Sequence, residues 1–120
     1  KVIRMSEMYL IAAEASYPAN EADAKKYVNE VTSRRGAAAI ASTGAALLED
    51  IITERRKELA FEGERYHDLQ RLKRDVVRGT NYPAAARTIA FTNFRRIFPI
   101  PQGELDANPT IKAQQNPGWN

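Results

Sequence analysis

Residues Ile51 to Asp75 read IITERRKELAFEGERYHDLQRLKRD, and this stretch decides the fold. Side chains along it and just before it recur at three- and four-residue steps, a spacing that places them on one face of an α-helix. These positions are Leu47, Leu48, Ile51, Ile52, Arg55, Leu59 and Glu62. The pattern predicts a helix that is half apolar and half charged and that continues as far as Gly63.

The helical pattern ends at Gly63, since glycine adopts the left-handed conformation of a helix terminus without a Cβ penalty. Tyr66, Leu69 and Leu72 then follow at three-residue steps, so a second, shorter helix is expected. In the first helix Arg55, Glu58 and Glu62 share the sector beside the apolar one, where we expect a half-buried ion network. Such a network favours one helix register over others more than it adds net stability.

Two further helices are predicted upstream. The first covers Val2 to Ser16 and ends at Tyr17 and Pro18, because proline disfavours helical geometry in the residue before it. The second begins after Asn20, a good N-cap, and stops at Gly36. Thr43 is the expected N-cap of the third helix.

Two helix pairs in succession, at about residues 2–35 and 44–75, indicate tetratricopeptide-like stacking. Residues 76–92 have no sustained period of 2 or 3.6, which predicts a long loop. The length of the chain, 120 residues, is that of a single domain. The prediction is therefore a single all-α domain over residues 1–120, with an irregular cap over residues 76–120.

The sequence shows no residue cluster or motif that is typical of an enzyme active site. There is no cysteine, the one histidine is His67, and no phosphate-binding motif is present, so we expect neither a metal nor a cofactor. Glu58 and Glu62 lie too nearly parallel on one helix to flank a sugar bond. Acidic residues interrupt the basic clusters, and a net charge of +3 with interspersed signs does not favour nucleic-acid binding.

The pattern ER..ELxxEGxRxxDLxR in this stretch resembles the signature near the C-terminus of the SusD/RagB family. Two other segments are similar to that family: RMSEMYLIAAEA at Arg4 to Ala15, and the closing run that contains PIPQGE and QNPGW. The signature is carried by Glu54, Arg55, Glu58, Leu59, Glu62, Gly63, Arg65, Asp68, Leu69 and Arg71. The resemblance covers nearly the whole chain.

The resemblance implies a non-enzymatic, glycan-capturing lipoprotein at the outer-membrane surface of Bacteroidetes. Its partners would be oligosaccharides and a SusC-like TonB-dependent transporter. Because the chain begins at Lys1 without an initiator methionine, we expect a fragment. The missing upstream part would carry the secretion signal, the lipid-bearing cysteine and most of the fold. No run approaches the roughly 20 apolar residues that span a bilayer.

Aromatic side chains offer flat apolar faces on which sugar rings stack. Tyr82 in the predicted loop and Trp119 in the tail are the candidates without an obvious core role. The resemblance argues against them, since SusD-like proteins form the glycan platform mainly outside this region, and it implies a structural role for Arg55, Glu58, Glu62, Gly63, Arg65, Asp68 and Arg71. The alternative function is a helical-repeat adaptor that binds a protein segment in its groove.

Overall fold

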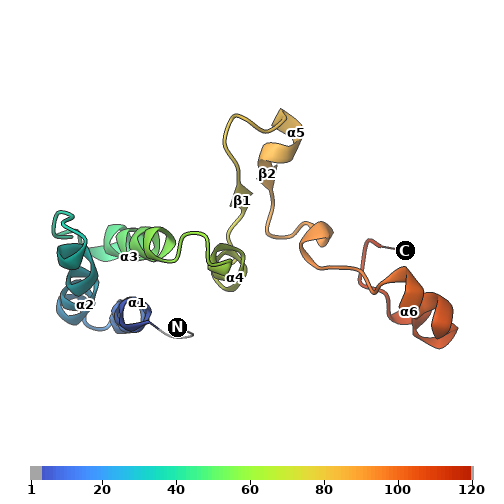
Figure 1. Ribbon diagram of the computed structural model, residues 1–120, viewed down its shortest axis with the longest axis horizontal. Coiled ribbons are helices and arrows are strands. Elements are labelled where there is room, and N and C mark those ends of the chain that lie inside the picture. The colour runs from blue at the N-terminus through green and yellow to red at the C-terminus, as the bar shows by residue number, and fades with distance from the viewer. Residues whose placement is uncertain (1–3, 120) are drawn as a thin grey trace. The chain divides into compact units, whose positions relative to one another are not determined.

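The computed structural model of the chain describes residues 4–119 (Figure 1). Within them the fold is helical, with one short hairpin, and the predicted all-α class is confirmed. The chain forms two compact units, Lys1–Tyr66 and His67–Asn120. The single-domain assignment stays a prediction. The two units are described one after the other.

The first unit contains α1 (Met5–Ser16), α2 (Glu21–Arg34) and α3 (Gly44–Glu58), and α4 (Glu64–Arg71) begins in it. The caps of α2 agree with the sequence. The Asn20 side chain accepts a hydrogen bond from the Asp23 amide at 3.1 Å, and Gly36 has the left-handed φ of +67°. These two residues bound α2 as predicted.

Thr43 precedes α3 as predicted, but its side chain makes no capping hydrogen bond. The first amide of α3 is satisfied from another helix instead. Glu21, in the first turn of α2, accepts a hydrogen bond from the Gly44 amide at 2.9 Å. A carboxylate is the favoured partner at the positive end of a helix dipole, so Glu21 takes the role that the sequence assigned to Thr43.

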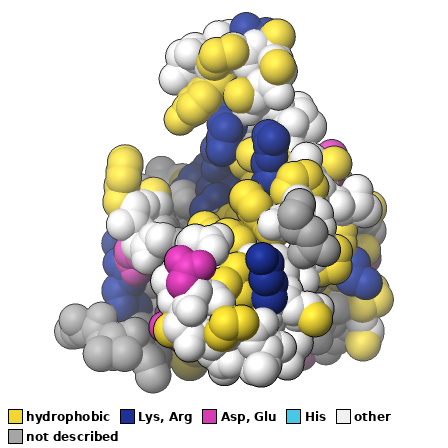
Figure 2. Space-filling view, turned by 90° about the vertical axis from the view of Figure 1, so that its right-hand side faces the viewer, with side chains coloured by type: hydrophobic (Ala, Val, Ile, Leu, Met, Phe, Trp, Pro, Cys, Tyr) yellow, Lys and Arg dark blue, Asp and Glu magenta, His cyan; other side chains and the backbone are white. Residues whose placement is uncertain are grey.

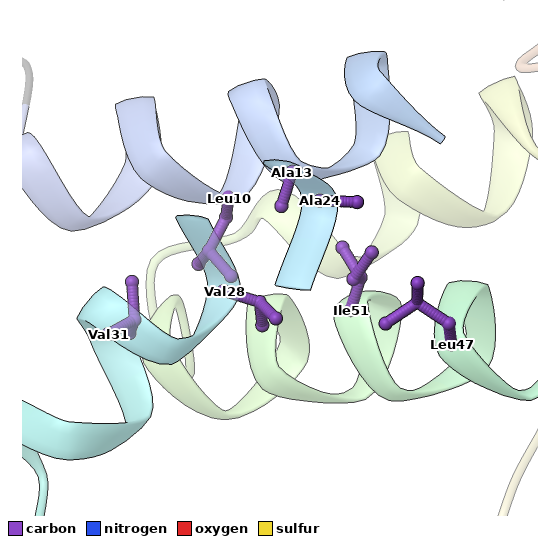
Figure 3. Close-up of a cluster of buried hydrophobic side chains, with 7 residues drawn as sticks. All are labelled: Leu10, Ala13, Ala24, Val28, Val31, Leu47 and Ile51. Carbon is purple, nitrogen blue, oxygen red and sulfur yellow. The ribbon is translucent and has the colours of Figure 1, made fainter. Parts of the chain in front are cut away.

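An apolar core joins the three helices of the first unit (Figure 3). Because its members recur at three- and four-residue steps on each helix, they share one face. Burying an aliphatic side chain of this size stabilises a fold by about 1.5–3 kcal/mol. The core consists of Leu10 and Ala13 from α1, Ala24, Val28 and Val31 from α2, and Leu47 and Ile51 from α3.

The third helix is shorter than predicted. It ends at Glu58 rather than near Gly63, and the turn that follows contains two left-handed residues, Phe61 with φ +68° and Gly63 with φ +86°. Leu59 lies at the C-cap yet remains buried. The apolar spacing therefore identified the buried side chain correctly, although the residue that carries it is no longer helical.

The second unit continues α4 and then forms a hairpin where the sequence predicted a loop. Strand β1 (Val76–Val77) pairs antiparallel with β2 (Thr88–Ile89), and Val76 faces Ile89. The short helix α5 (Ala84–Arg87) lies between the strands. Two-residue strands are too short to produce a period of 2, which is why the sequence pattern missed them.

Hydrogen bonds flank the paired strands of this hairpin at its base and on its tip side. The Asp75 carboxylate accepts a hydrogen bond from the Phe91 amide at 2.8 Å, and the Arg78 amide donates to the Arg87 carbonyl at 2.8 Å. Three short helices follow the hairpin, namely η1 (Phe94–Arg96), α6 (Gln102–Ala107) and η2 (Pro109–Gln114). The predicted irregular cap thus consists of short regular pieces.

Among residues 4–119, no helix combines the length and the apolar character that crossing a bilayer requires.

Truncating the centre of the core tests this packing. Ile51 is fully buried, so Ile51→Ala should reduce the free energy of unfolding by about 2–5 kcal/mol, through lost burial and the cavity left behind. Urea denaturation of the intact protein measures the loss. Val77→Ala is the control, since Val77 is mostly exposed and its truncation should cost under about 0.5 kcal/mol. Equal effects of the two substitutions would contradict the core assignment.

Candidate functional site

The charged half of the 51–75 stretch pairs with the first two helices. The Arg55 guanidinium, with its side chain only 9% exposed, lies 3.4 Å from a carboxylate oxygen of Glu7 on α1. The Glu62 carboxylate pairs with Arg4, which precedes α1. Arg4 also donates to the Glu58 carbonyl at 3.0 Å. The expected half-buried ion network is present, and its pairs link separate segments of the first unit.

Glu58 is the most enclosed carboxylate of these pairs. Its side chain is 7% exposed. Its two carboxylate oxygens accept hydrogen bonds from Nε and Nη2 of Arg35, and the bond from Nε measures 2.9 Å. Two-point contact between a guanidinium and a carboxylate is stronger and more directional than a single bond. The Arg35 hydrogen bond lowers the pKa of Glu58, against a smaller opposing effect of burial, and Ser6 lowers it further.

This pairing argues against acid–base chemistry at Glu58. A general acid needs a pKa raised toward neutrality, whereas the pKa of Glu58 moves down. The side chain is also occupied by a cation from the end of α2. The arrangement holds α2 against the end of α3.

The second part of the charged motif lies on α4. Asp68 is buried and accepts a hydrogen bond from Arg71 Nε at 2.9 Å, one helical turn away. Arg65 precedes this pair on the same helix, and His67 is exposed beside it. Across residues 4–119, His, Asp and Glu nowhere gather in a group of three that could hold a metal ion.

Tyr82 lies at the tip of the hairpin and is 43% exposed. The Arg78 guanidinium lies 5.1 Å from its ring centroid, within cation–π range. Arg87 fixes the backbone of the tip by donating to the Tyr82 carbonyl at 2.9 Å and to the Thr80 carbonyl at 3.1 Å. Figure 2 shows apolar side chains gathered over the α5 end of this hairpin.

Trp119 lies in the tail and is 37% exposed. Its indole Nε1 donates to the Ile97 carbonyl at 2.9 Å, and its ring meets Phe94 edge to face at 5.2 Å. Gly118 has φ +88°, and a Cβ there would lie 2.5 Å from the Phe94 ring. Trp119 is thus held in place by the segment that precedes α6.

The two closing motifs of the sequence are bonded to each other. The side chain of Gln115, in QNPG, makes two hydrogen bonds with the backbone of Ile100, in PIP. Its amide oxygen accepts from the Ile100 amide at 2.8 Å, and its amide nitrogen donates to the Ile100 carbonyl at 3.2 Å. Asn116 donates to the Phe98 carbonyl at 2.6 Å. The sequence reveals both motifs but not this contact, because spacing along a chain does not indicate pairing across 15 residues.

The sequence also did not indicate that Phe98 is exposed. Its side chain is 83% exposed, and it follows Phe94, the ring partner of Trp119, by one helical turn's worth of sequence. The sequence places Phe98 in an apolar run, IFPIP, which is the usual sign of a buried segment. The second unit therefore presents three exposed aromatic residues around its tail, while Tyr82 belongs to the hairpin.

Comparison with known proteins identifies the family. The model of the SusD family matches residues 1–119. The chain belongs to the SusD family. SusD-like protein P2 of Formosa agariphila is 34% identical over an alignment of 129 residues, which covers 98% of this chain and 25% of that protein.

Two solved structures from Bacteroides vulgatus have the same fold. A SusD superfamily protein matches with a TM-score of 0.78 and 34% identity, over 99% of this chain and 28% of that one. A SusD-like carbohydrate binding protein matches with a TM-score of 0.69 and 29% identity, over 92% of this chain and 29% of that one. The chain therefore spans about a quarter of the length of these SusD relatives.

The pH dependence of stability tests the Glu58–Arg35 pair. Because the folded-state pKa of Glu58 is lowered, its contribution is fully present above the unfolded pKa of about 4.3 and is lost as the pH falls through the folded value. The melting temperature of the wild type should fall more steeply on acidification below about pH 5 than that of Glu58→Gln. Arg35→Gln should follow Glu58→Gln. Parallel profiles for all three proteins would contradict the pairing.

Gly118→Ala tests the anchoring of the tail. The new Cβ would collide with the Phe94 ring and would force alanine into a left-handed conformation, so the tail should loosen. Amide hydrogen exchange of residues 116–119 in the intact protein should become about tenfold faster or more. Gly103→Ala is the matched control, since nothing lies within 4 Å of its Cβ position. Unchanged exchange in Gly118→Ala would refute the anchoring.

Proposed function

We propose that the intact protein captures oligosaccharides or polysaccharides at the surface of a bacterial outer membrane and delivers them to a SusC-like TonB-dependent transporter. The observation that carries this proposal is the SusD family match over residues 1–119. The solved relative described as a SusD-like carbohydrate binding protein supports it. The protein acts by binding alone, and a lipid anchor outside this chain holds it at the membrane.

In this scheme the charged motif has a structural role. Arg55, Glu58 and Glu62 pair with residues of α1, α2 and the segment before α1, and Asp68 pairs with Arg71 within α4. Ligand-binding residues need side chains directed to solvent, whereas Arg55, Glu58 and Asp68 are nearly inaccessible. The motif serves glycan capture indirectly, by fixing the helices on which the rest of the protein is mounted.

Tyr82 and Trp119 remain the glycan-contact candidates within this chain, and a neighbouring side chain already contacts each ring. One face of the Tyr82 ring lies next to Arg78, and Trp119 meets Phe94 edge to face rather than side by side. A stacking platform requires an open ring face, and these contacts reduce the open area of both rings. We therefore place the main glycan site in the part of the intact protein that this chain does not span.

Asp68→Ala distinguishes a structural motif from a binding motif. Removing the buried carboxylate leaves Arg71 without this acceptor and should reduce the free energy of unfolding by about 1–3 kcal/mol, while glycan affinity changes less than about twofold. Arg65→Ala should behave in the same way. Lys26→Ala, at an exposed position on α2, is the control for both readouts. A large loss of affinity with an unaltered melting curve would contradict the structural role.

Calorimetric titration tests the binding function itself. A panel of oligosaccharides and polysaccharides is titrated into the intact protein and into its Tyr82→Ala and Trp119→Ala variants. We expect binding of at least one glycan by all three proteins with similar affinity. Absence of binding across a broad panel would refute glycan capture. A loss confined to one variant would instead place the glycan site on that aromatic residue.

A further inference from the structure

One stretch of the second unit carries positive charge without any acidic residue. Residues 76–103 contain no aspartate or glutamate, whereas acidic and basic residues alternate through the helices of the first unit. The basic residues of this stretch are Arg78, Arg87, Arg95 and Arg96. Two of them, Arg78 and Arg87, flank the paired strands of the hairpin, and Figure 2 shows Lys and Arg side chains directly below its apolar end.

Arg78 and Arg87 lie at opposite positions of the antiparallel pair. In the register of the two strands Val77 faces Thr88. The next opposite positions are those of Arg78 and Arg87, and the Arg78 amide donates to the Arg87 carbonyl at 2.8 Å. Like charges directly opposite each other destabilise a two-stranded ladder. The hairpin therefore holds together two cations that repel each other.

Both guanidinium groups are held against the same residue, Tyr82. That of Arg78 lies 5.1 Å from the centroid of the Tyr82 ring, and its Nη1 donates to the Ala86 carbonyl at 3.2 Å. Arg87 donates from Nε to the Tyr82 carbonyl at 2.9 Å and from Nη2 to the Thr80 carbonyl at 3.1 Å. Because these acceptors are neutral, the contacts fix the two guanidinium groups without balancing their charge.

The arginines of the first unit have partners of another kind, since each of four is paired with a glutamate. In the described part of the chain, no carboxylate forms such a pair with Arg78 or Arg87. Each of these two guanidinium groups also has more N–H donors than its backbone contacts use. The balanced pairs are Arg4 with Glu62, Arg34 with Glu30, Arg35 with Glu58 and Arg55 with Glu7.

We propose that Arg78 and Arg87 together bind a carboxylate or sulfate group of a glycan, so that the intact protein captures acidic polysaccharides. The planar fork of a guanidinium matches two oxygens of such a group. Since backbone contacts already hold both side chains, binding costs little conformational entropy. The proposal rests on the proposed function, which supplies the glycan. It adds a contact to charged groups of the polymer, while the main sugar contacts remain outside this chain.

Matched pairs of polysaccharides test the substrate class. Pectate is compared with fully methyl-esterified pectate, and dextran sulfate with dextran, so that only the charge differs within each pair. Each polymer is titrated calorimetrically into the intact protein. We expect at least one charged polymer to bind at least about tenfold more tightly than its uncharged counterpart, and added salt to reduce this difference. Equal affinities within both pairs would overturn the proposal.

Arg78→Gln and Arg87→Gln test the location of the contact. Each substitution should weaken binding of the charged polymer by about tenfold or more, because a hydrogen-bonded charge pair is lost. Binding of uncharged glycans should change by less than about twofold. Lys112→Gln removes the same charge from an exposed position of η2 and is the control. Equal weakening by all three substitutions would indicate attraction by net charge alone and would overturn the site.

Thr80→Glu tests the site with both arginines and their backbone contacts in place. Arg87 already bonds the Thr80 carbonyl, so a carboxylate at this exposed position is placed to pair with it. Binding of the charged polymer should weaken about as much as in Arg87→Gln, without a lower melting temperature. Thr80→Gln is the control and should bind as the wild type does. Unchanged binding by Thr80→Glu would overturn the proposal.

A vesicle experiment distinguishes an acidic glycan from a membrane surface. If Arg78→Gln lost binding to phosphatidylglycerol vesicles but kept its affinity for the charged polymers, the arginines would belong to a lipid contact and the proposal would fall. The titrations also separate this proposal from glycan capture. Binding of uncharged glycans alone would refute the acidic class and leave capture intact, whereas absence of binding to every glycan would refute both.

Discussion

The packing of α3 against α1 and α2 is the interaction on which the first unit depends. Leu47 and Ile51 bury completely between the two earlier helices, and the charged half of the same stretch then reaches outward to them. The apolar contacts supply most of the stabilisation. The ion pairs at Arg55 and Glu58 fix the alignment of the helices, since a misaligned helix would leave a nearly buried charge without its partner.

These pairings account for the high density of charge in the motif. Glutamates at four-residue spacing are a common sign of a catalytic or metal site, but here Glu58 and Glu62 each face an arginine from a distant part of the sequence. The downward shift in the pKa of Glu58 follows from that pairing. In the function that we propose, these residues maintain the scaffold and the ligand binds elsewhere.

The sequence predicted the parts of the fold that depend on local periodicity. The helices, the Asn20 cap, the turn at Gly36 and the buried side of α3 all follow from spacing and capping within a few residues. It failed where distant residues decide the conformation. Glu21 replaces Thr43 at the start of α3, and Asp75 closes a hairpin whose strands are too short for a pattern. Neighbouring residues in the sequence likewise do not predict the charged partners of Arg55, Glu58 and Glu62.

A crystal structure of the intact protein with a bound oligosaccharide would show whether the charged motif is part of the scaffold or a binding site. We expect sugar density outside residues 51–75, with Glu58 still bonded to Arg35 and Asp68 to Arg71. Density for a sugar hydroxyl bonded to the carboxylate of Glu58, Glu62 or Asp68 would contradict it, because the charged motif would then be a binding site.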